Sequence, residues 1–362
     1  MKIIMTTRQF YPCIGGVETY MLECAKRLVR KGHEVEVLAL NRNYYTNEKL
    51  KPLEEYEGIK IRRIPFIKLP LRPFPIYSPF SLLKIFINFD VIHCHDIRFL
   101  FEYNLIAKFI LRKRLVITSH GFIHHQKSML PLKRFVFKFY YSILMRYADT
   151  LHLVSKQDED KINSNHYNIA RVPGGIDYNF FSSVKQSPEP KTLLIFGRLD
   201  NHKGIENVFR ILKSFPEYRL RLVYGSSEKN YFHKLKTIES NLHLGNQISW
   251  IGNISRNDLL NEIGKAEYIL LPSNYEGFGL TALEAMASGS IVIANKIAAY
   301  QNIITDGING FLFDFNNPDI NHLKKIFNLI KQQKNEVSEL AKKTSSAYDW
   351  DSHVEQFEKI YN

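Results

Sequence analysis

The amino-acid sequence predicts an α/β protein with two doubly wound, Rossmann-like domains that face each other across a cleft. Strand and helix patterns alternate along the chain, which favours such domains over a β-sandwich or a helical bundle. The chain has 362 residues, 45% of them hydrophobic, which is enough for two well-packed cores.

Turn signals divide the chain. We expect a first domain over residues 1–172, a linker rich in proline, glycine and polar residues over 173–190, and a second domain over 191–349. Residues 350–362 are expected to form a last helix. Its apolar positions Trp350, Val354, Phe357 and Tyr361 follow helical spacing.

The most informative segment has two carboxylates, Glu276 and Glu284, on either side of a glycine-bearing turn. Residues 268–272 form an apolar run typical of a buried strand, and residues 280–287 have the pattern of a helix. The turn therefore lies at a strand-to-helix junction.

The start of that helix is a predicted seat for phosphate. Its first amides lack partners within the helix and carry the positive end of the helix dipole. The missing Cβ atoms of two glycines let a ligand approach the backbone. The expected donor-binding residues of this turn are Gly277, Phe278, Gly279, Leu280 and Thr281.

Carboxylates repel phosphate but accept hydrogen bonds from hydroxyl groups. Glu276 and Glu284 therefore suit the hydroxyls of a sugar or a ribose. Phosphate at the amides and hydroxyls at the acids together describe a nucleotide sugar. Glycine-rich turns with nearby acids also occur in α/β proteins that bind nothing there.

Two cations follow another apolar run, residues 192–196. Arg198 offers a forked contact and Lys203 a point charge, and both are suited to a diphosphate at the carboxyl end of a strand. Fixed positive charge there stabilises a departing nucleoside diphosphate, so that no metal ion is required. An ordinary solvated loop is the simpler alternative for an isolated arginine and lysine.

The first domain begins with a predicted strand over residues 2–6 and a helix over residues 20–29, joined by a loop that contains Gly15 and Gly16. Such a loop suits a phosphate, although a ligand-free turn would look the same.

His120 follows a further apolar strand and is able to donate to a sugar hydroxyl. The run His93-Cys94-His95-Asp96 is not expected to bind metal, because it lacks a paired second half. A polar role near the acceptor is open for His95 and Asp96.

At these positions the sequence resembles the retaining GT-B glycosyltransferases of family four. That family has two glutamates separated by seven residues around a Gly-Phe-Gly turn, as Glu276 and Glu284 are here. It also has a Gly-Arg-Leu, three-residue, Lys-Gly pattern, which residues 197–204 match. The resemblance implies that Glu276 contacts the transferred sugar and Glu284 the ribose of the donor.

The resemblance implies further roles. Arg198 and Lys203 would bind the donor phosphates, His120 would contact the transferred sugar, and Gly15 and Gly16 match paired glycines of the first loop. The catalytic set is then His120, Arg198, Lys203 and Glu276. The family often has asparagine where this chain has Gly174 or Gly175, and it often has a second glycine in the loop 224–227; these departures concern contacts to the donor base.

The resemblance also implies an acceptor-binding first domain and a last helix that crosses back to it. The sugar configuration would be retained by front-face substitution, in which the departing phosphate helps to remove the acceptor proton. No cofactor is implied, and the co-substrate would be a UDP- or GDP-linked sugar.

The formal net charge of +13 is uneven: residues 1–180 hold 28 Lys and Arg against 16 Asp and Glu, and the remainder hold 21 against 20. Within residues 130–146, cations alternate with aromatic residues, as in a helix on an anionic membrane surface. An ordinary domain helix with solvated lysines fits equally well. No nucleic-acid-binding motif accompanies the charge. The candidate membrane residues are Lys133, Arg134, Lys138 and Arg146.

The sequence shows no signal peptide and no apolar run of membrane-spanning length, and its three cysteines cannot all pair within one chain. We therefore expect a cytoplasmic protein, and the basic aromatic segment leaves open a peripheral contact with the inner face of the cell membrane.

The predicted function is transfer of a sugar to a hydroxyl of a glycan or lipid-linked glycan, in cell-surface polysaccharide synthesis. The alternatives are a sugar phosphorylase or nucleotide-sugar epimerase of the same fold, or a non-catalytic partner subunit that binds glycan or nucleotide.

Overall fold

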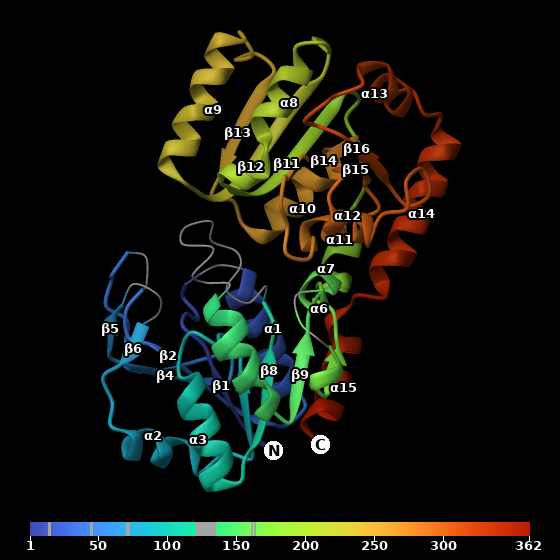
Figure 1. Ribbon diagram of the computed structural model, residues 1–362. Helices are drawn as coiled ribbons and strands as arrows, with labels where there is room; N and C mark the ends of the chain where they lie inside the picture. The colour runs from blue at the N-terminus through green and yellow to red at the C-terminus, as the bar shows by residue number, and fades with distance from the viewer. Residues whose placement is uncertain (14–15, 44–45, 70–72, 121–134, 161, 163) are drawn as a thin grey trace. The chain divides into compact units, whose positions relative to one another are not determined.

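The computed structural model describes residues 1–13, 16–43, 46–69, 73–120, 135–160, 162 and 164–362 (Figure 1). The chain divides into two compact units. Unit 1 comprises Met1–Gly174 together with Trp350–Asn362, and unit 2 comprises Gly175–Asp349.

Unit 1 contains a sheet with the strand order β10-β9-β8-β7-β1-β2-β4-β3. All its neighbouring strands are parallel except β3 and β4, which form an antiparallel edge. A separate short hairpin consists of β5 and β6. The strands are β1 (Lys2–Thr6), β2 (Glu34–Leu40), β3 (Leu53–Tyr56), β4 (Ile59–Ile64), β5 (Phe66–Lys68), β6 (Pro73–Pro75), β7 (Val91–Cys94), β8 (Arg114–Thr118), β9 (Thr150–Leu153) and β10 (Ile169–Arg171).

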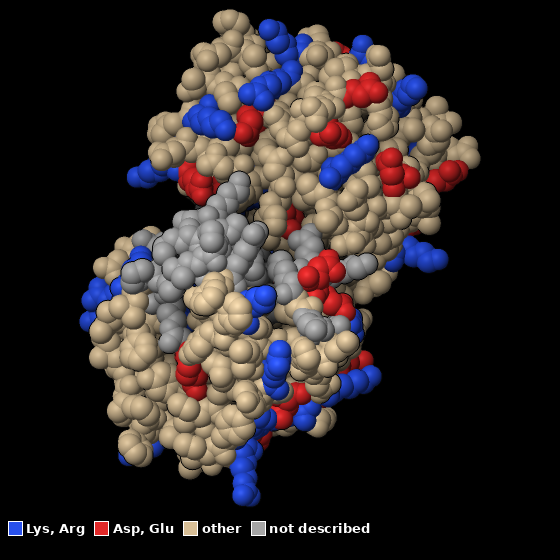
Figure 2. Space-filling view, viewed as in Figure 1, with Lys and Arg blue, Asp and Glu red and all other residues tan. Residues whose placement is uncertain are grey.

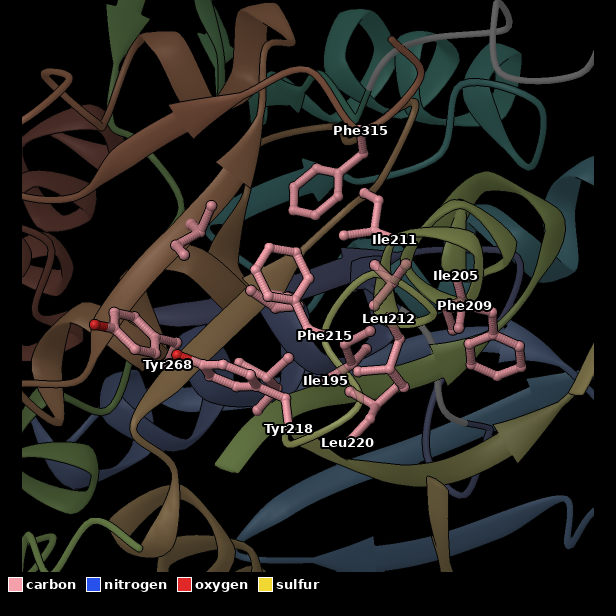
Figure 3. Packing of buried hydrophobic residues seen from close by; sticks show 14 of the residues in the cluster. Ile195, Ile205, Phe209, Ile211, Leu212, Phe215, Tyr218, Leu220, Tyr268 and Phe315 are labelled. Atoms are coloured by element: carbon pink, nitrogen blue, oxygen red, sulfur yellow. The ribbon is translucent and has the colours of Figure 1, made fainter. Parts of the chain in front are cut away.

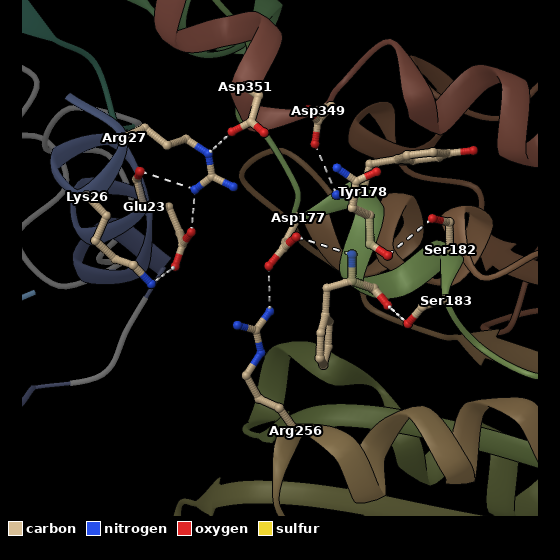
Figure 4. Close-up of polar contacts among 12 residues, drawn as sticks. Glu23, Lys26, Arg27, Asp177, Tyr178, Ser182, Ser183, Arg256, Asp349 and Asp351 are labelled. Atoms are coloured by element: carbon tan, nitrogen blue, oxygen red, sulfur yellow. Dashed lines mark hydrogen bonds and ion pairs between the residues drawn. The ribbon is translucent and has the colours of Figure 1, made fainter. Parts of the chain in front are cut away.

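Helices cover both faces of this sheet (Figure 1). They are α1 (Gly16–Arg30), α2 (Pro79–Phe86), α3 (Phe101–Leu111), α5 (Ser142–Leu144), α6 (Lys156–Glu159) and α15 (Trp350–Tyr361), with the shorter turns η1 (Phe137–Tyr141), η2 (Met145–Tyr147) and η3 (Ser164–His166). The last helix, α15, belongs to unit 1 and packs against α1. Its Trp350 and Phe357 are buried in the same core cluster as Tyr20 and Met21. An ion pair adds to this contact, since Arg27 Nε donates to Asp351 Oδ1 at 2.7 Å (Figure 4).

Unit 2 has an all-parallel sheet in the order β13-β12-β11-β14-β15-β16. Its strands are β11 (Thr192–Leu199), β12 (Arg219–Ser227), β13 (Ile248–Gly252), β14 (Tyr268–Leu271), β15 (Ile291–Asn295) and β16 (Phe311–Phe313). Its helices are α7 (Tyr178–Ser182), η4 (Asn201–Lys203), α8 (Ile205–Leu212), α9 (Lys229–Asn241), α10 (Arg256–Lys265), α11 (Leu280–Ala287), α12 (Ala298–Gln301), α13 (Ile320–Phe327) and α14 (Lys331–Ser346).

The apolar run of β14 is explained by burial on both faces of this sheet. Tyr268 and Leu270 point into one core cluster, part of which Figure 3 shows, and Ile269 and Leu271 point into the opposite one. Successive side chains of a strand alternate between faces, so a central parallel strand needs an unbroken apolar sequence.

Residues 175–190, expected to be a linker, belong to unit 2. Within them, α7 packs against α11 and α14, and Phe181 is buried in the core. The proline and glycine signals mark irregular backbone there, but irregular backbone also packs against a domain when it carries apolar side chains.

The strand order gives each unit a topological switch point, beside β1 and β7 in unit 1 and beside β11 and β14 in unit 2. In open α/β sheets, ligands bind at the carboxyl ends of the strands at such a point. The predicted α/β architecture with two Rossmann-like units is confirmed, and the loops that follow these four strands are where a site is expected.

Candidate functional site

Two predicted residues of unit 2 meet at its switch point. Lys203 lies in η4 after β11, and Glu276 lies in the loop after β14. Lys203 Nζ donates to Glu276 Oε1 at 2.8 Å, and the two side chains are only 15% and 19% exposed. The pairing of β11 with β14 therefore brings together residues that are 73 positions apart.

Glu276 Oε1 also accepts two hydrogen bonds that the sequence did not suggest. Ser273 Oγ donates to it at 2.8 Å and Tyr300 OH at 3.3 Å. Tyr300 lies on α12 in a mainly apolar stretch, where nothing in the local pattern distinguishes it from an ordinary core residue. Three donors thus converge on a single carboxylate oxygen.

The two loops are fixed to each other by backbone contacts. The amide of Asn274 donates to the carbonyl of His202 at 2.7 Å. Asn295 Nδ2 donates to the carbonyl of Ser273 at 3.1 Å. Gly204 is required at this crossing, because its φ is +61° and a Cβ there would lie 2.6 Å from the carbonyl oxygen of Pro272. The loop that carries Glu276 is therefore held rigidly against η4.

The second predicted cation is placed differently. Arg198 lies within β11, which extends to Leu199 and has an irregular register at this point, so the strand does not end at residue 196 as predicted. Its side chain is 59% exposed and lies 3.6 Å from Asp200 Oδ2. Lys203 is therefore held by a protein carboxylate, whereas most of the Arg198 side chain is exposed to solvent.

The glycine turn leads into α11 as predicted. Gly279 is the N-cap residue with a φ of +97°, and no side chain caps the first turn of the helix. A Cβ at Gly279 would lie 3.2 Å from Ile303 Cδ1 and from Tyr300 Cδ1, whereas one at Gly277 would meet nothing within 4 Å. The fold itself therefore requires glycine at position 279 but not at 277. An uncapped helix start of this kind is able to accept an anion.

Glu284 lies on α11 and is half-buried. Burial raises its pKa to about 7; Arg256 and Lys203 oppose this shift, and Glu276 adds to it. Arg256 itself pairs with Asp177 Oδ2 at 3.4 Å (Figure 4). No hydrogen bond to the Glu284 carboxylate is formed within the described part of the chain. A carboxylate that is poorly solvated and has no protein donor is well suited to accept hydrogen bonds from ligand hydroxyls.

At the carboxyl edge of the unit 1 sheet, His120 follows β8, and its Nε2 lies 3.2 Å from Nδ1 of His95. His95 is buried, and burial together with the neighbouring histidines lowers its pKa well below the usual value. The first residue of α1 is Gly16, and Gly15 lies outside the described residues. These residues lie in the segments that follow β1, β7 and β8.

His93 has a structural role. His152 Nε2 bonds the carbonyl of Val172 at 2.7 Å and must therefore be protonated, because a carbonyl only accepts. His152 Nδ1 is then an acceptor, and Thr118 Oγ1 donates to it at 2.8 Å. Thr118 Oγ1 in turn accepts from His93 Nε2 at 2.6 Å. His93 Nδ1 is left to accept from Tyr361 OH at 2.7 Å. This chain of bonds satisfies neutral histidines. Among the described residues, no group of three His, Cys, Asp or Glu side chains is arranged to hold a metal ion.

Asp96 also has protein partners. It accepts from Arg98 Nε at 2.8 Å and lies 3.4 Å from Arg8 Nε. These two cations hold its pKa well below the usual range against the effect of burial. Asp96 is therefore ionised and serves to fix two arginines at the carboxyl edge of the sheet.

The basic aromatic segment of unit 1 is partly a domain helix. Phe137, Tyr141 and Met145 are buried at helical spacing, as an ordinary core-facing helix requires. Lys138 and Arg146 are exposed, and Lys133 and Arg134 lie outside the described residues. Large apolar side chains on this segment are also exposed: Phe135, Phe139, Tyr140, Ile143 and Tyr147. In the described part of the chain, no helix is long and apolar enough to cross a membrane.

Comparisons with known proteins cover nearly the whole chain. The family model described as Glycosyltransferase Family 4 matches residues 14–180, and that described as Glycosyl transferases group 1 matches residues 178–347. The GDP-mannose:cellobiosyl-diphosphopolyprenol alpha-mannosyltransferase of Komagataeibacter xylinus is 24% identical over 373 residues, which cover 100% of this chain and 93% of that protein.

Two further proteins are similar over their full length. The phosphatidyl-myo-inositol mannosyltransferase of Mycobacterium tuberculosis is 23% identical over 385 residues, which cover 100% of this chain and 96% of the relative. The crystal structure of HepE from Anabaena in complex with UDP superposes with a TM-score of 0.77 at 19% identity, and covers 99% of both chains.

Proposed function

Since this chain belongs to the group 1 glycosyltransferases of family 4, we propose that it moves a sugar from a nucleotide diphosphate sugar to a hydroxyl of a lipid-linked glycan, with retention of configuration. The chain is a glycosyltransferase with the GT-B fold. The observation that carries the finer proposal is the Lys203–Glu276 pair at the switch point, directly beside the uncapped start of α11.

In this proposal the donor lies along the loops that follow β11 and β14. The ribose hydroxyls donate to Glu284, the diphosphate meets the first amides of α11, and the sugar hydroxyls donate to Glu276. Gly277, Phe278, Leu280 and Thr281 complete the turn around the phosphates. Support comes from the absence of a side-chain cap on α11 and of a protein donor to Glu284 among the described residues.

The chemistry is that of a leaving group stabilised by fixed charge. As the glycosidic bond breaks, its electrons pass to the distal phosphate, where Lys203 and Arg198 balance the new negative charge. Lys203 has three donors and gives one to Glu276, so two remain for the phosphate. The departing phosphate accepts the acceptor proton, and Glu276 orients the sugar without becoming a nucleophile. The proposal uses no metal ion, and it assigns His120 to the transferred sugar.

We assign the donor to the UDP- or GDP-linked sugars and the acceptor to lipid-linked glycans. The relatives support this assignment, because one is named for GDP-mannose and a diphosphopolyprenol and HepE was crystallised with UDP. The proposed role is cell-surface polysaccharide synthesis. An acceptor of this kind carries negative charge, which agrees with the excess of cations in residues 1–180.

We also propose that unit 1 makes a peripheral contact with the inner face of a cell membrane. Among the described residues, 17 of the 21 exposed large hydrophobic side chains belong to unit 1, and only Tyr275, Ile308, Ile330 and Leu340 belong to unit 2. Figure 2 shows a largely uncharged surface over α2 and α3. Lys138 and Arg146 add the cations that anionic lipids attract.

The test is direct. Nucleotide sugars are screened by thermal shift, and the stabilising donor is incubated with lipid-linked acceptors, with and without a chelator. A product that is heavier by one sugar, with the anomeric configuration of the donor and unaffected by chelation, supports the proposal. Turnover of the donor without any glycan acceptor indicates a phosphorylase or an epimerase instead.

A further inference from the structure

We propose that Tyr300 is a positioning residue that fixes the carboxylate of Glu276, so that one oxygen is held by the protein and the other faces the donor sugar. This inference rests on the proposed function, and it adds a determinant of sugar selectivity to it. Tyr300 lies outside every motif that the sequence offers for this site.

The distribution of hydrogen bonds on Glu276 carries the inference. Lys203 at 2.8 Å, Ser273 at 2.8 Å and Tyr300 at 3.3 Å all bond Oε1. Within the described part of the chain, Oε2 has no partner. A carboxylate rotates about its last bond unless its oxygens are held differently, and three donors on one oxygen remove that freedom. Oε2 is then the atom left for a ligand.

An ionised carboxylate oxygen only accepts, so the group that faces Oε2 must be a donor. A sugar hydroxyl satisfies this requirement, whereas a deoxy or fluoro analogue at the same position does not. A site built around a buried polar group discriminates strongly against ligands that leave it unpaired. The fixed orientation of the Glu276 carboxylate therefore selects donors whose sugar carries a hydroxyl at the carbon that faces Oε2.

Tyr300 is built into the fold so that its hydroxyl has a fixed direction. Its side chain is fully buried at 0% exposure, and its ring lies below the glycine turn, where a Cβ on Gly279 would approach Cδ1 to 3.2 Å. Burial and the charge of Glu276 raise the pKa of the phenol well above the usual value, so the hydroxyl keeps its proton and donates. One side chain thus supports both the carboxylate and the turn that would hold the phosphates.

Unit 2 contains a matched control. Tyr268 is also fully buried, but its hydroxyl donates to the backbone carbonyls of Ile326 and Phe327, at 3.0 and 3.1 Å, and not to a predicted site residue. Tyr268→Phe removes one buried phenol hydroxyl, as Tyr300→Phe does, but it leaves the hydrogen bonds of Glu276 unchanged.

The experiment measures kcat and KM for the donor, together with the Kd of the free nucleoside diphosphate. Tyr300→Phe keeps the ring below Gly279 and removes only the hydroxyl. We expect kcat/KM to fall about 10-fold, as for the loss of a hydrogen bond to a charged group, while nucleotide affinity stays unchanged. Preference for the donor over its deoxy analogue should fall as well. Ser273→Ala should act in the same direction, and Tyr268→Phe should alter thermal stability without altering selectivity.

A double-mutant cycle separates positioning from a general structural effect. In a Glu276→Gln background, Tyr300→Phe should cost little more, because the group it positions has lost its charge. Equal losses in the wild-type and Glu276→Gln backgrounds would overturn the inference, as would an unchanged kcat/KM in Tyr300→Phe. In both cases transfer by the wild type leaves the proposed function standing. If the wild type binds no nucleotide sugar, the proposed function fails and this inference fails with it.

Discussion

Tyr361 donates a hydrogen bond of 2.7 Å to Nδ1 of His93, a residue 268 positions earlier in the chain. Both side chains are buried, and the bond joins the last helix to the centre of the unit 1 sheet. From His93 the chain of bonds continues through Thr118 and His152 to the carbonyl of Val172. Helix α15 is therefore connected to Val172 through side chains of the three neighbouring strands β7, β8 and β9.

Tyr361→Phe should destabilise unit 1. The change leaves His93 Nδ1 buried without a donor, which typically costs about 1–3 kcal/mol. The exposed Tyr147→Phe is the matched control. Denaturant unfolding followed by a probe in unit 1 should show a lower midpoint for Tyr361→Phe only. Equal midpoints for the two variants would mean that the bond contributes nothing measurable.

Removal of the site cations should slow transfer. Lys203→Ala and Arg198→Ala each take away charge that balances the departing phosphate, and loss of one preorganised group typically costs about 10²–10³ in rate. Lys213→Ala removes an exposed lysine of the same unit and should be neutral. Steady-state kinetics with the identified donor measure the effect. Near-normal transfer by both site variants would refute their assignment to the leaving group.

Substitution of the two glutamates should affect the affinity for the nucleotide differently. Glu284→Gln should weaken the free nucleoside diphosphate and the donor together, since both contain the ribose. Glu276→Gln should spare the free nucleotide and weaken only interactions with the sugar. Calorimetric titration of both ligands into each variant tests this division. Equal losses of nucleotide affinity would contradict it.

Stability should depend on pH through Glu284. Its folded-state pKa of about 7 lies above the ordinary value of 4.5, so the folded state holds the proton more tightly than the unfolded state. The stabilisation that comes from this bound proton is complete below about pH 4.5 and is lost as the pH rises through about 7. Glu284→Gln should therefore raise stability at pH 8 by on the order of 1–3 kcal/mol and change it little at pH 5.

Unfolding of the wild type and Glu284→Gln at both pH values checks this prediction. Glu339→Gln, at an exposed acid of unit 2, controls for the change in net charge. A stability gain of Glu284→Gln that is the same at pH 5 and pH 8 would exclude ionisation as its cause.

Unit 1 should bind anionic membranes. Purified protein should co-sediment with anionic vesicles and not with neutral ones, and added salt should weaken the binding without abolishing it, because the exposed aromatic residues add an apolar component. Lys138→Gln together with Arg146→Gln should cost about 1 kcal/mol per cation. The unit 2 pair Lys213→Gln with Lys229→Gln should bind as the wild type does. Failure to sediment with anionic vesicles at low salt would rule out the membrane contact and leave sugar transfer unaffected.

The local elements were largely predictable. The strand at residues 2–6 and the helices at 280–287 and 350–361 agree with the structure, because the period of their apolar residues is a property of each segment alone. Boundaries differed from the prediction where packing decides them. Helix α1 begins at Gly16 instead of residue 20, and β11 includes Arg198.

The sequence alone determined the two-domain α/β class, the glycine turn, and the residue types offered to a nucleotide sugar at Glu276, Glu284, Arg198 and Lys203. These features are local, because each depends on side chains that are close together in the chain. The tertiary structure decided that β11 lies beside β14, and so that Lys203 meets Glu276. It also decided that the phenol of Tyr300 reaches the same carboxylate oxygen, and that the exposed apolar side chains gather on unit 1. Strand order and burial result from the packing of the whole chain, and a tyrosine in an apolar stretch has no local signal that names its acceptor.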